Sequence, residues 1–427
     1  MIMPSYDATL YDWRENEETR SRTKRERRRR RGRRVAGVAI ALTCLSVVAY
    51  NLLPVSWYSQ RAYDRKYGFG PYENRLLPGT RAALARDVKD LQTFVEQQRG
   101  GTYRHPVSVE FLPDKQFRQA LGDDRGSASD EDIALGLAPN ASALANETRE
   151  LDGSVTGFYD DRSGKLYVRG QTLDDEARIT LVHELTHAYD DQHFNLTRFD
   201  DTDDNDADAA ELALVEGDAV AVESSYLETL PIAVRCPGLE DAYQAYDSDC
   251  RAAGYREDAV DDASADALEA EDDFPYAIGG RFIATLRRLG GPNAVNKAFG
   301  DPPVDTAQVI DISTYLSHRR PVGVRYPTPP GVASVRHVHV GALRLSAIVS
   351  NGKLGPGLRG YVRGWRGDSG VTFTRNRRQC LDDRVVLSDS VTAATLIGQL
   401  TTWRARRTDR SFRRESPITV LVERCGT

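Results

Sequence analysis

Residues 180–190 read TLVHELTHAYD, and this stretch is the most informative part of the sequence for the fold and the chemistry of the chain. His183 and His187 are four residues apart, so on an α-helix their imidazole rings project from one face toward a common point. Glu184 lies one step around the helix, where its carboxylate can reach a water molecule without ligating the metal itself. The spacing predicts a helix that supplies two zinc ligands and a general base.

A second helix is predicted over 207–230, and it carries the remaining metal ligand. Residues 211–223 read ELALVEGDAVAVE, which is rich in small apolar side chains. A carboxylate in such a setting is costly unless it is paired or binds a metal. Glu216 is therefore predicted to be the third ligand, and the alternatives are Glu211 and Glu223.

The residues around these ligands are predicted to support the site. Gly217 allows another backbone to approach the second helix closely. Asp218 or Asp190 is predicted to accept the other N–H of a ligand histidine and so fix its tautomer; the alternative for Asp218 is an ordinary acid on the helix surface. The sequence does not single out an oxyanion-stabilising donor, and the four candidates are Tyr189, His193, Tyr276 and His318.

The order of these motifs resembles the gluzincin type of zincin metallopeptidases, in which two motif histidines and a glutamate on a following helix bind zinc. Within that group the chain is similar to bacterial membrane-anchored HExxH proteins whose core reads HELTHA–DQHF and then ALVEGDA. The resemblance covers about residues 155–315 well and 340–405 weakly. The matching segments are His183–Ala188, Asp191–Phe194, Ala213–Ala219, Phe274–Tyr276, Gly290–Gly291, Asp301–Pro303 and, more faintly, Gly364–Asp368.

The resemblance implies an α+β, zincin-like fold with an active-site helix, a glutamate-bearing second helix and an edge β-hairpin. It also implies a Zn²⁺ cofactor and hydrolysis of peptide bonds, with Glu184 as the general base. Two β-prone runs, 155–159 and 165–169, flank a turn and predict the hairpin. Strand 165–169 is expected to be the edge strand along which an extended peptide substrate lays its backbone.

The chain also departs from the relatives that it resembles. Residues 305–315 lack a histidine and acidic groups that the relatives have there, so substrate specificity or activity is expected to differ. Thermolysin-like members place an aspartate four residues after the ligand glutamate, and here that position is Val220. The partner of the ligand histidine must therefore come from elsewhere.

The N-terminal region predicts a membrane anchor. Residues 20–34 hold ten Arg and one Lys against one Glu, and the uncharged stretch 35–53 is long enough to span a bilayer. The arginine run then places the N-terminus in the cytoplasm and the body outside it, which fits a bacterial source. Beside an apolar span, this run is an orientation signal rather than a nucleic-acid site. The alternative is a cleaved signal peptide with its site at residues 47–49.

These observations divide the chain into five parts. A basic cytoplasmic tail (1–34) and a transmembrane helix (35–54) that contacts the lipid bilayer are followed by a tether (55–78). A zincin-like metallopeptidase core (79–330) and a C-terminal α+β extension (331–427) packed on it complete the chain. Helices are expected over 80–98, 173–192, 207–230, 275–289 and 390–406, with a strand at 107–112.

Four cysteines lie in the exported part, and an even number in an oxidising compartment predicts two disulfides. Of three pairings, Cys236–Cys250 and Cys380–Cys425 are favoured. No C-x-x-C spacing exists, so a cysteine-based zinc site is not expected.

Two stretches, 200–208 and 257–273, concentrate acidic residues. The first lacks the glycine and the terminal glutamate of an EF-hand loop, so the calcium template does not fit. A solvated loop that caps the helix after it is the favoured interpretation.

Taken together, the sequence predicts a membrane-anchored zinc peptidase that acts on peptide or protein substrates outside the cytoplasm. Two alternatives stay open. One is a catalytically inactive zincin-like scaffold or binding protein of the cell envelope. The other is a zinc hydrolase that acts on a cell-wall amide, such as a stem peptide or its crosslink.

Overall fold

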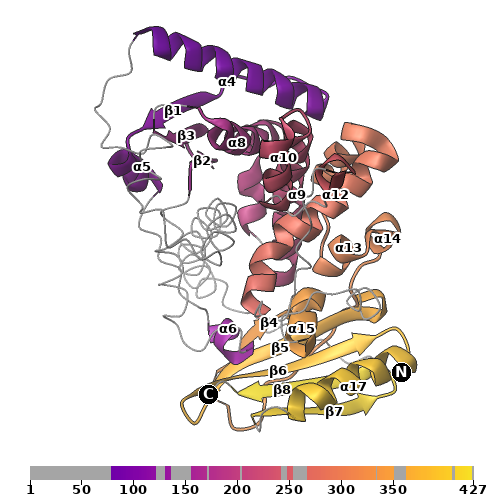
Figure 1. Cartoon of the computed structure of the whole chain (residues 1–427). Helices are drawn as coiled ribbons and strands as arrows, with labels where there is room; N and C mark the ends of the chain where they lie inside the picture. Colours follow the sequence, from indigo (N-terminus) through magenta and orange to yellow (C-terminus); the bar gives the residue numbers. More distant parts are fainter. Residues whose placement is uncertain are drawn as a thin grey trace, which may run out of the picture.

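The structure, a computed structural model, describes residues 78–121, 130–135, 155–170, 173–201, 204–241, 248–252, 267–332, 334–350, 362–405 and 409–425. These residues form a mixed α+β fold with one three-stranded and one five-stranded sheet (Figure 1), which confirms the expected class. The predicted tail, membrane span and tether lie outside the described residues, except for Pro78. Among the helices that are described, none combines the length and apolar character needed to cross a membrane.

The first half of the described chain builds the three-stranded sheet and places a helix beside it. The elements are α4 (Pro78–Arg99), β1 (Ser108–Leu112), α5 (Asp114–Leu121), α6 (Asp130–Leu135), β2 (Gly157–Asp160), β3 (Lys165–Arg169) and α8 (Asp175–Phe194). Apolar residues of α4, β2, β3 and α8 share one hydrophobic core, which includes Val95, Leu166, Leu181 and Leu185. The predicted hairpin is present, since β2 pairs antiparallel with β3.

The position of strand 165–169 corrects one expectation. The sheet order is β1-β3-β2, so β3 is the central strand, with β1 parallel on one side and β2 antiparallel on the other. β3 therefore has no free edge on which a peptide could pair. The edge strand of the hairpin is β2, and it lies against α8, where the hydroxyls of Thr156 and Thr180 are 2.8 Å apart.

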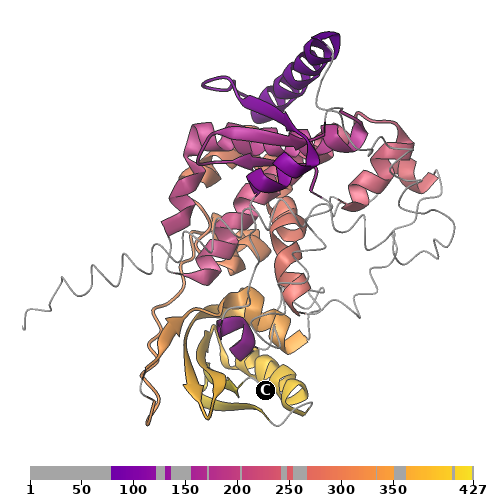
Figure 2. The same ribbon diagram turned by 90° about the vertical axis from the view of Figure 1, so that its left-hand side faces the viewer.

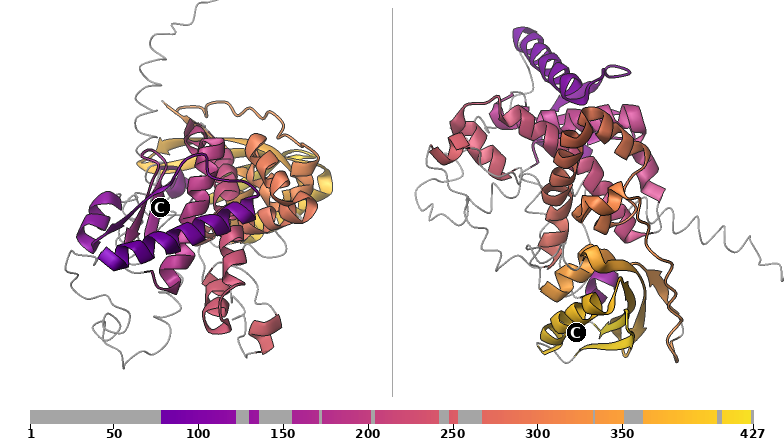
Figure 3. Two further views of the ribbon diagram at one scale, coloured as in Figure 1. Left: turned by 90° about the horizontal axis from the view of Figure 1, so that it is seen from above. Right: turned by 90° about the vertical axis from the view of Figure 1, so that its right-hand side faces the viewer.

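Two long helices form the centre of the molecule. After the 3₁₀ turn η1 (Leu196–Asp201), α9 (Asn205–Leu227) packs against α12 (Ala267–Gly300), and α12 extends toward the second sheet (Figure 3). Gly290 and Gly291 leave the helical region inside α12, which matches the expected helix end at residue 289. Along the chain, α10 (Ile232–Asp241) and α11 (Ser248–Ala252) follow α9 and precede α12.

The contact between α9 and α12 depends on two glycines. A Cβ atom added to Gly217 would lie 2.4 Å from the carbonyl carbon and oxygen of Gly279, and one on Gly279 would lie 2.3 Å from the Ala213 oxygen. Such distances are impossible for real side chains, so both positions require glycine for close approach of the backbones. The sequence-based reason for Gly217 is therefore confirmed.

The C-terminal region forms an antiparallel sheet of order β4-β5-β6-β8-β7. Its core also contains residues of α9 and α12, among them Leu214 and Ile283, so the extension packs on the central helices. Figure 2 shows this sheet and α17 at the opposite end of the molecule from α4. The elements are α13 (Thr306–Ile310), α14 (Ile312–Leu316), β4 (Arg336–Val338), α15 (Gly341–Ser350), β5 (Trp365–Arg375), β6 (Arg378–Leu387), α17 (Ser390–Ala405), β7 (Arg410–Ser416) and β8 (Thr419–Cys425).

Both predicted disulfides are present. Cys236 and Cys250 join α10 to α11, and Cys380 and Cys425 join the neighbouring strands β6 and β8. The first closes a short loop that begins soon after α9 ends, and the second ties the end of the chain into the C-terminal sheet.

Candidate metal centre

Helix α8 holds the two motif histidines in a fixed and buried position. Its first turn is capped by the carboxylate of Asp174, which accepts a hydrogen bond from the Ala177 N–H, and it ends at Asn195 in the left-handed region. Every residue from Leu181 to Asp190 is buried. The helix is thus enclosed by protein on all sides along this stretch, which limits the motion of His183 and His187.

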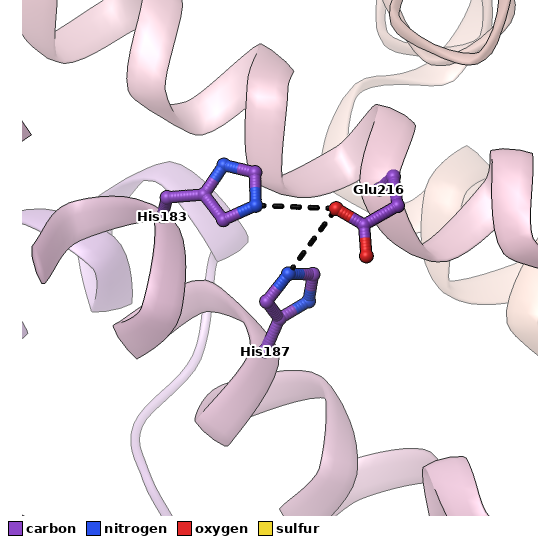
Figure 4. Close-up of side chains that lie close together, drawn as sticks. All are labelled: His183, His187 and Glu216. Atoms are coloured by element: carbon purple, nitrogen blue, oxygen red, sulfur yellow. Dashed lines mark hydrogen bonds and ion pairs between the residues drawn. The ribbon is translucent and has the colours of Figure 1, made fainter. Parts of the chain in front are cut away.

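Glu216 on α9 meets both histidines, as the sequence predicted (Figure 4). Its Oε2 lies 3.2 Å from Nε2 of His183 and 3.5 Å from Nε2 of His187. One donor atom from each residue lies within 4.8 Å of the other two. Donors about 2.0–2.1 Å from a tetrahedral zinc ion would be about 3.3–3.4 Å apart, so both measured distances fit such an ion. Among the residues that the structure describes, His183, His187 and Glu216 form the group that could hold a metal ion.

The charges of the group suit a cation. Burial alone would raise the pKa of Glu216, but the charge of His187 and the hydrogen bond from His183 hold it at about 2. Burial would lower the pKa of His183, yet its hydrogen bonds to Glu216 and Glu223 raise it to about 10. The carboxylates therefore favour positive charge here, whether carried by protons or by a metal ion.

Glu223 orients His183 from the far side of the ring. Its Oε2 lies 2.9 Å from Nδ1 of His183, while the Nε2 atom of the same ring faces Glu216. A carboxylate on the second ring nitrogen fixes the tautomer in which Nε2 is free to bind a metal. The sequence had placed Glu223 among the alternative ligands, and the geometry gives it this supporting position instead.

The prediction that Asp218 or Asp190 holds a ligand histidine is wrong. Both carboxylates bind Arg99 at the end of α4: Asp190 Oδ1 accepts from Nη2 at 2.7 Å, and Asp218 Oδ2 lies 2.9 Å from Nε. All three side chains have an exposed fraction of 0%. Arg287 of α12 adds a contact of 3.2 Å to Asp218. The two acids can be buried because Arg99 and Arg287 supply positive charge beside them. The resulting ion cluster joins α4, α8, α9 and α12.

The general base predicted from the motif is positioned by the edge strand. Oε2 of Glu184 accepts a hydrogen bond of 2.8 Å from the backbone N–H of Tyr159 in β2. Burial raises the pKa of Glu184, although the two histidines oppose the shift. A carboxylate with a raised pKa is a better proton acceptor, as general-base catalysis requires. The Tyr159 hydroxyl donates to Asp191 at 2.8 Å, so this side chain lies along α8.

Three of the four oxyanion candidates make their contacts elsewhere. Tyr189 stacks on His193 with ring centroids 4.1 Å apart, and Nδ1 of His193 lies 2.8 Å from the Tyr189 carbonyl oxygen. His318 is exposed and lies 3.4 Å from Asp301. The fourth, Tyr276, is buried on α12. Sequence reasoning did not include Tyr159, whose location on the edge strand depends on pairing that the sequence leaves open.

The acidic loop before α9 caps that helix, as expected. The carboxylate of Asp204 accepts from the N–H groups of Asp206 and Ala207. It also binds Nδ1 of His339 near the start of α15, and buried Asp206 accepts from the Thr306 hydroxyl. The N-terminus of the ligand-bearing helix is therefore joined to the C-terminal extension.

The His339–Asp204 pair predicts a pH-dependent contribution to stability. The hydrogen bond that the His339 ring donates to Asp204 raises the pKa of His339 to about 9, while burial opposes the shift and the nearby charges of Asp204, Asp368 and Asp206 add to it. The pair therefore stabilises the fold fully below about pH 6.5 and loses this effect as the pH rises through about 9. His339→Gln should cost at most about 1 kcal/mol at pH 6, because the pair is half exposed, and nothing at pH 10. Urea unfolding at both pH values measures this, and an equal loss at both would contradict it.

Glu223 gives a second prediction. Glu223→Ala should weaken zinc binding about 10- to 100-fold, because His183 would lose the partner that fixes its tautomer. Glu223→Gln, which keeps an oxygen acceptor, should lose less. Competition with a fluorescent zinc chelator measures both affinities. Wild-type affinity in Glu223→Ala would show that the contact does not support metal binding.

Comparison with known proteins places the chain in no established group. No family model matches it, no curated protein is similar to it, and no solved structure resembles it. Its function must therefore be argued from the site.

Proposed function

We propose that the chain is a membrane-anchored, zinc-dependent peptidase that hydrolyses peptide bonds outside the cytoplasm. The observation that carries the proposal is the spacing of the donor atoms of His183, His187 and Glu216, with Glu184 directly beside them. Three protein ligands leave a fourth position open, which is typical of catalytic rather than structural zinc sites. The anchor follows from residues 35–54 of the sequence.

The residues divide the chemistry among them. Zinc held by the three ligands would polarise the scissile carbonyl and lower the pKa of a water molecule. Glu184 accepts a proton from the attacking water and returns it to the amine that leaves. The N–H of Tyr159 keeps one oxygen of Glu184 in place while the other stays available. Glu223 holds His183 in its metal-binding tautomer throughout.

Strand β2 offers a backbone edge beside this site. The bond from Arg169 N to Thr156 O marks a hydrogen-bonded pair, so by the alternation of antiparallel ladders Gly157 and Tyr159 point their backbone groups away from β3. The Tyr159 N–H donates to Glu184, so this edge lies beside the proposed general base. An extended substrate would run along β2, a role that the sequence had assigned to 165–169.

A second candidate function is a metal-binding scaffold without catalysis. It is favoured by the burial of the group, since His183, Glu184 and Glu216 are only 1–3% exposed and His187 is 9% exposed. A substrate carbonyl must reach the fourth ligand position, and a site this enclosed has to open before it can.

One experiment separates the two functions. Full-length protein in detergent is assayed for zinc content and for cleavage of a broad peptide library, with and without a chelator. The peptidase should hold one zinc per chain and lose cleavage on chelation, with recovery when zinc is restored. His187→Ala should lose both properties, whereas His337→Ala, at an exposed histidine of β4, should keep them. Zinc without cleavage would favour the scaffold, and absence of zinc would contradict both functions.

A further inference from the structure

The charge of the chain is divided sharply between the metal-binding core and the C-terminal extension. Residues 79–330 contain 24 Lys and Arg against 48 Asp and Glu, whereas residues 331–427 contain 17 against 7. The core therefore carries a formal charge of −24 and the extension +10. A net charge of this size creates a field that attracts oppositely charged partners to one end of the molecule and repels them from the other.

Five basic residues of the extension lie at one end of the five-stranded sheet, whose strands Figure 1 shows. The strand registers place the β5–β6 turn, the end of β8 and the start of β7 together there, and α17 ends beside the start of β7. We call this set the arginine end. Four of its members are exposed and the last is half-buried: Arg375, Arg377, Arg378, Arg404 and Arg410.

Arginines lie directly opposite each other at this end of the sheet. Arg375 pairs directly with Arg378 across β5 and β6, and Arg410 pairs with Arg424 across β7 and β8. Like charges directly opposite each other in a sheet are destabilising. Asp409 lies 3.9 Å from Arg424 and offsets charge at the second pair, whereas Arg375 and Arg378 are both exposed, so an anion at this end of the sheet would relieve the first pair.

The turn between β5 and β6 adds a separate observation. Asn376 and Arg377 have φ values of 53° and 64°, the geometry of a two-residue hairpin turn in which glycine is preferred at the second position. Asparagine enters this region easily, but arginine does so at a cost. Arg377 thus has an unfavourable backbone conformation at an exposed turn, which points to a role for its charged side chain.

Aromatic rings hold three of these guanidinium groups in place. Arg375 lies 4.9 Å from the ring centroid of Phe373, Arg404 lies 4.9 Å from that of Phe412, and Arg410 lies 4.9 Å from that of Trp403. A planar guanidinium that rests on a ring can still present N–H groups to the oxygen atoms of a phosphate, as at Arg375 and Arg404. Arg410 also donates to the carbonyl oxygen of Trp403. The arginine end is thus partly preorganised for phosphate groups.

We propose that the arginine end binds the phosphate headgroups of an anionic bilayer. The bilayer is the favoured occupant because the sequence places an apolar, arginine-flanked segment at 35–53, which would keep the domain beside a membrane. The 24 residues between that span and α4 could extend over about 80 Å, so the tether does not by itself fix which end of the domain faces the lipid. The charge division fixes this orientation. The basic extension contacts the membrane surface, and the acidic core with its metal centre is held away from it.

The test uses full-length protein seated in neutral phosphatidylcholine nanodiscs, so that the anchor is already satisfied. Vesicles of phosphatidylcholine with or without phosphatidylglycerol are added, and co-sedimentation measures binding by the exposed domain. Binding should require phosphatidylglycerol and be lost at high salt. Arg377→Gly and Arg404→Gln should each lower the association constant about fivefold, whereas Arg288→Gln, at an exposed arginine of α12, should not change it.

Arg377→Gly also separates binding from folding. Glycine fits a φ of 64° without cost, so this variant should melt about 2–4 °C higher while binding vesicles more weakly. A purely structural arginine would give no loss of binding. Equal binding to both vesicle types, or an equal loss in Arg288→Gln, would overturn the proposal. Tighter binding to a soluble polyglycerol phosphate than to vesicles would overturn the bilayer as the occupant. None of these outcomes depends on peptidase activity.

Discussion

Glu184→Gln is expected to slow peptide hydrolysis by orders of magnitude while leaving one zinc ion bound per chain. Glutamine has the same shape as glutamate, and its amide oxygen can still accept the hydrogen bond from the Tyr159 N–H, which measures 2.8 Å in the native protein. The amide cannot take a proton from water, so the proposed general base is lost. Loss of such a group lowers the rate by about 10²- to 10⁴-fold. Initial rates on the best peptide substrate measure the change.

The control is Asp175→Asn, which removes an exposed carboxylate from the first turn of the same helix. It should keep both wild-type activity and zinc. Zinc content of Glu184→Gln is determined beside it, because a variant that loses the metal says nothing about the base. Full activity in a zinc-loaded Glu184→Gln would show that proton transfer runs through another group.

Arg99→Met is expected to destabilise the folded chain by about 3–5 kcal/mol, because it leaves two carboxylates buried without their cation. Arg99 is completely buried, and it is the side chain that contacts both Asp190 on α8 and Asp218 on α9. Arg287 contacts only Asp218, at 3.2 Å, so it cannot replace the missing charge at Asp190. Denaturant unfolding, monitored by circular dichroism, measures the loss.

Two further variants test this explanation. Arg86→Met removes an exposed arginine from the same helix and should change stability by less than about 0.5 kcal/mol. Arg99→Met combined with Asp190→Asn should recover part of the loss, since the uncompensated negative charge is then gone. A loss below about 1 kcal/mol in Arg99→Met would show that the cluster does not hold the four helices together.

Local sequence pattern was enough to identify the candidate metal centre. The i, i+4 spacing fixes where His183 and His187 point on any helix, and Glu216 stands out because a carboxylate is costly among small apolar residues. The β2–β3 hairpin, the paired cysteines and the cap at Asp204 also depend on residues close in the sequence, and all of them are present.

Interactions between distant segments were not predictable in the same way. β1 pairs in parallel with β3 across more than fifty residues, and this pairing moves the free edge of the hairpin to β2. Arg99 reaches Asp190 and Asp218 only because α4 packs on α8 and α9, so the sequence analysis assigned the two acids to a ligand histidine and missed the cation that they bind. Glu223 lies two turns beyond Glu216, and whether it binds metal or His183 depends on how α8 crosses α9.

Helix α9 belongs to both hydrophobic cores. Val222 packs with Leu181 and Leu185 of the motif helix, whereas Ala213 and Leu214 lie in the cluster that also contains residues of the C-terminal sheet. A chain cut short after residue 330 would uncover the first half of the helix that carries Glu216. Although the described residues after 330 supply none of the three candidate ligands, the helix that carries Glu216 depends on them: a frameshift late in the reading frame would disturb the candidate metal centre together with the sheet.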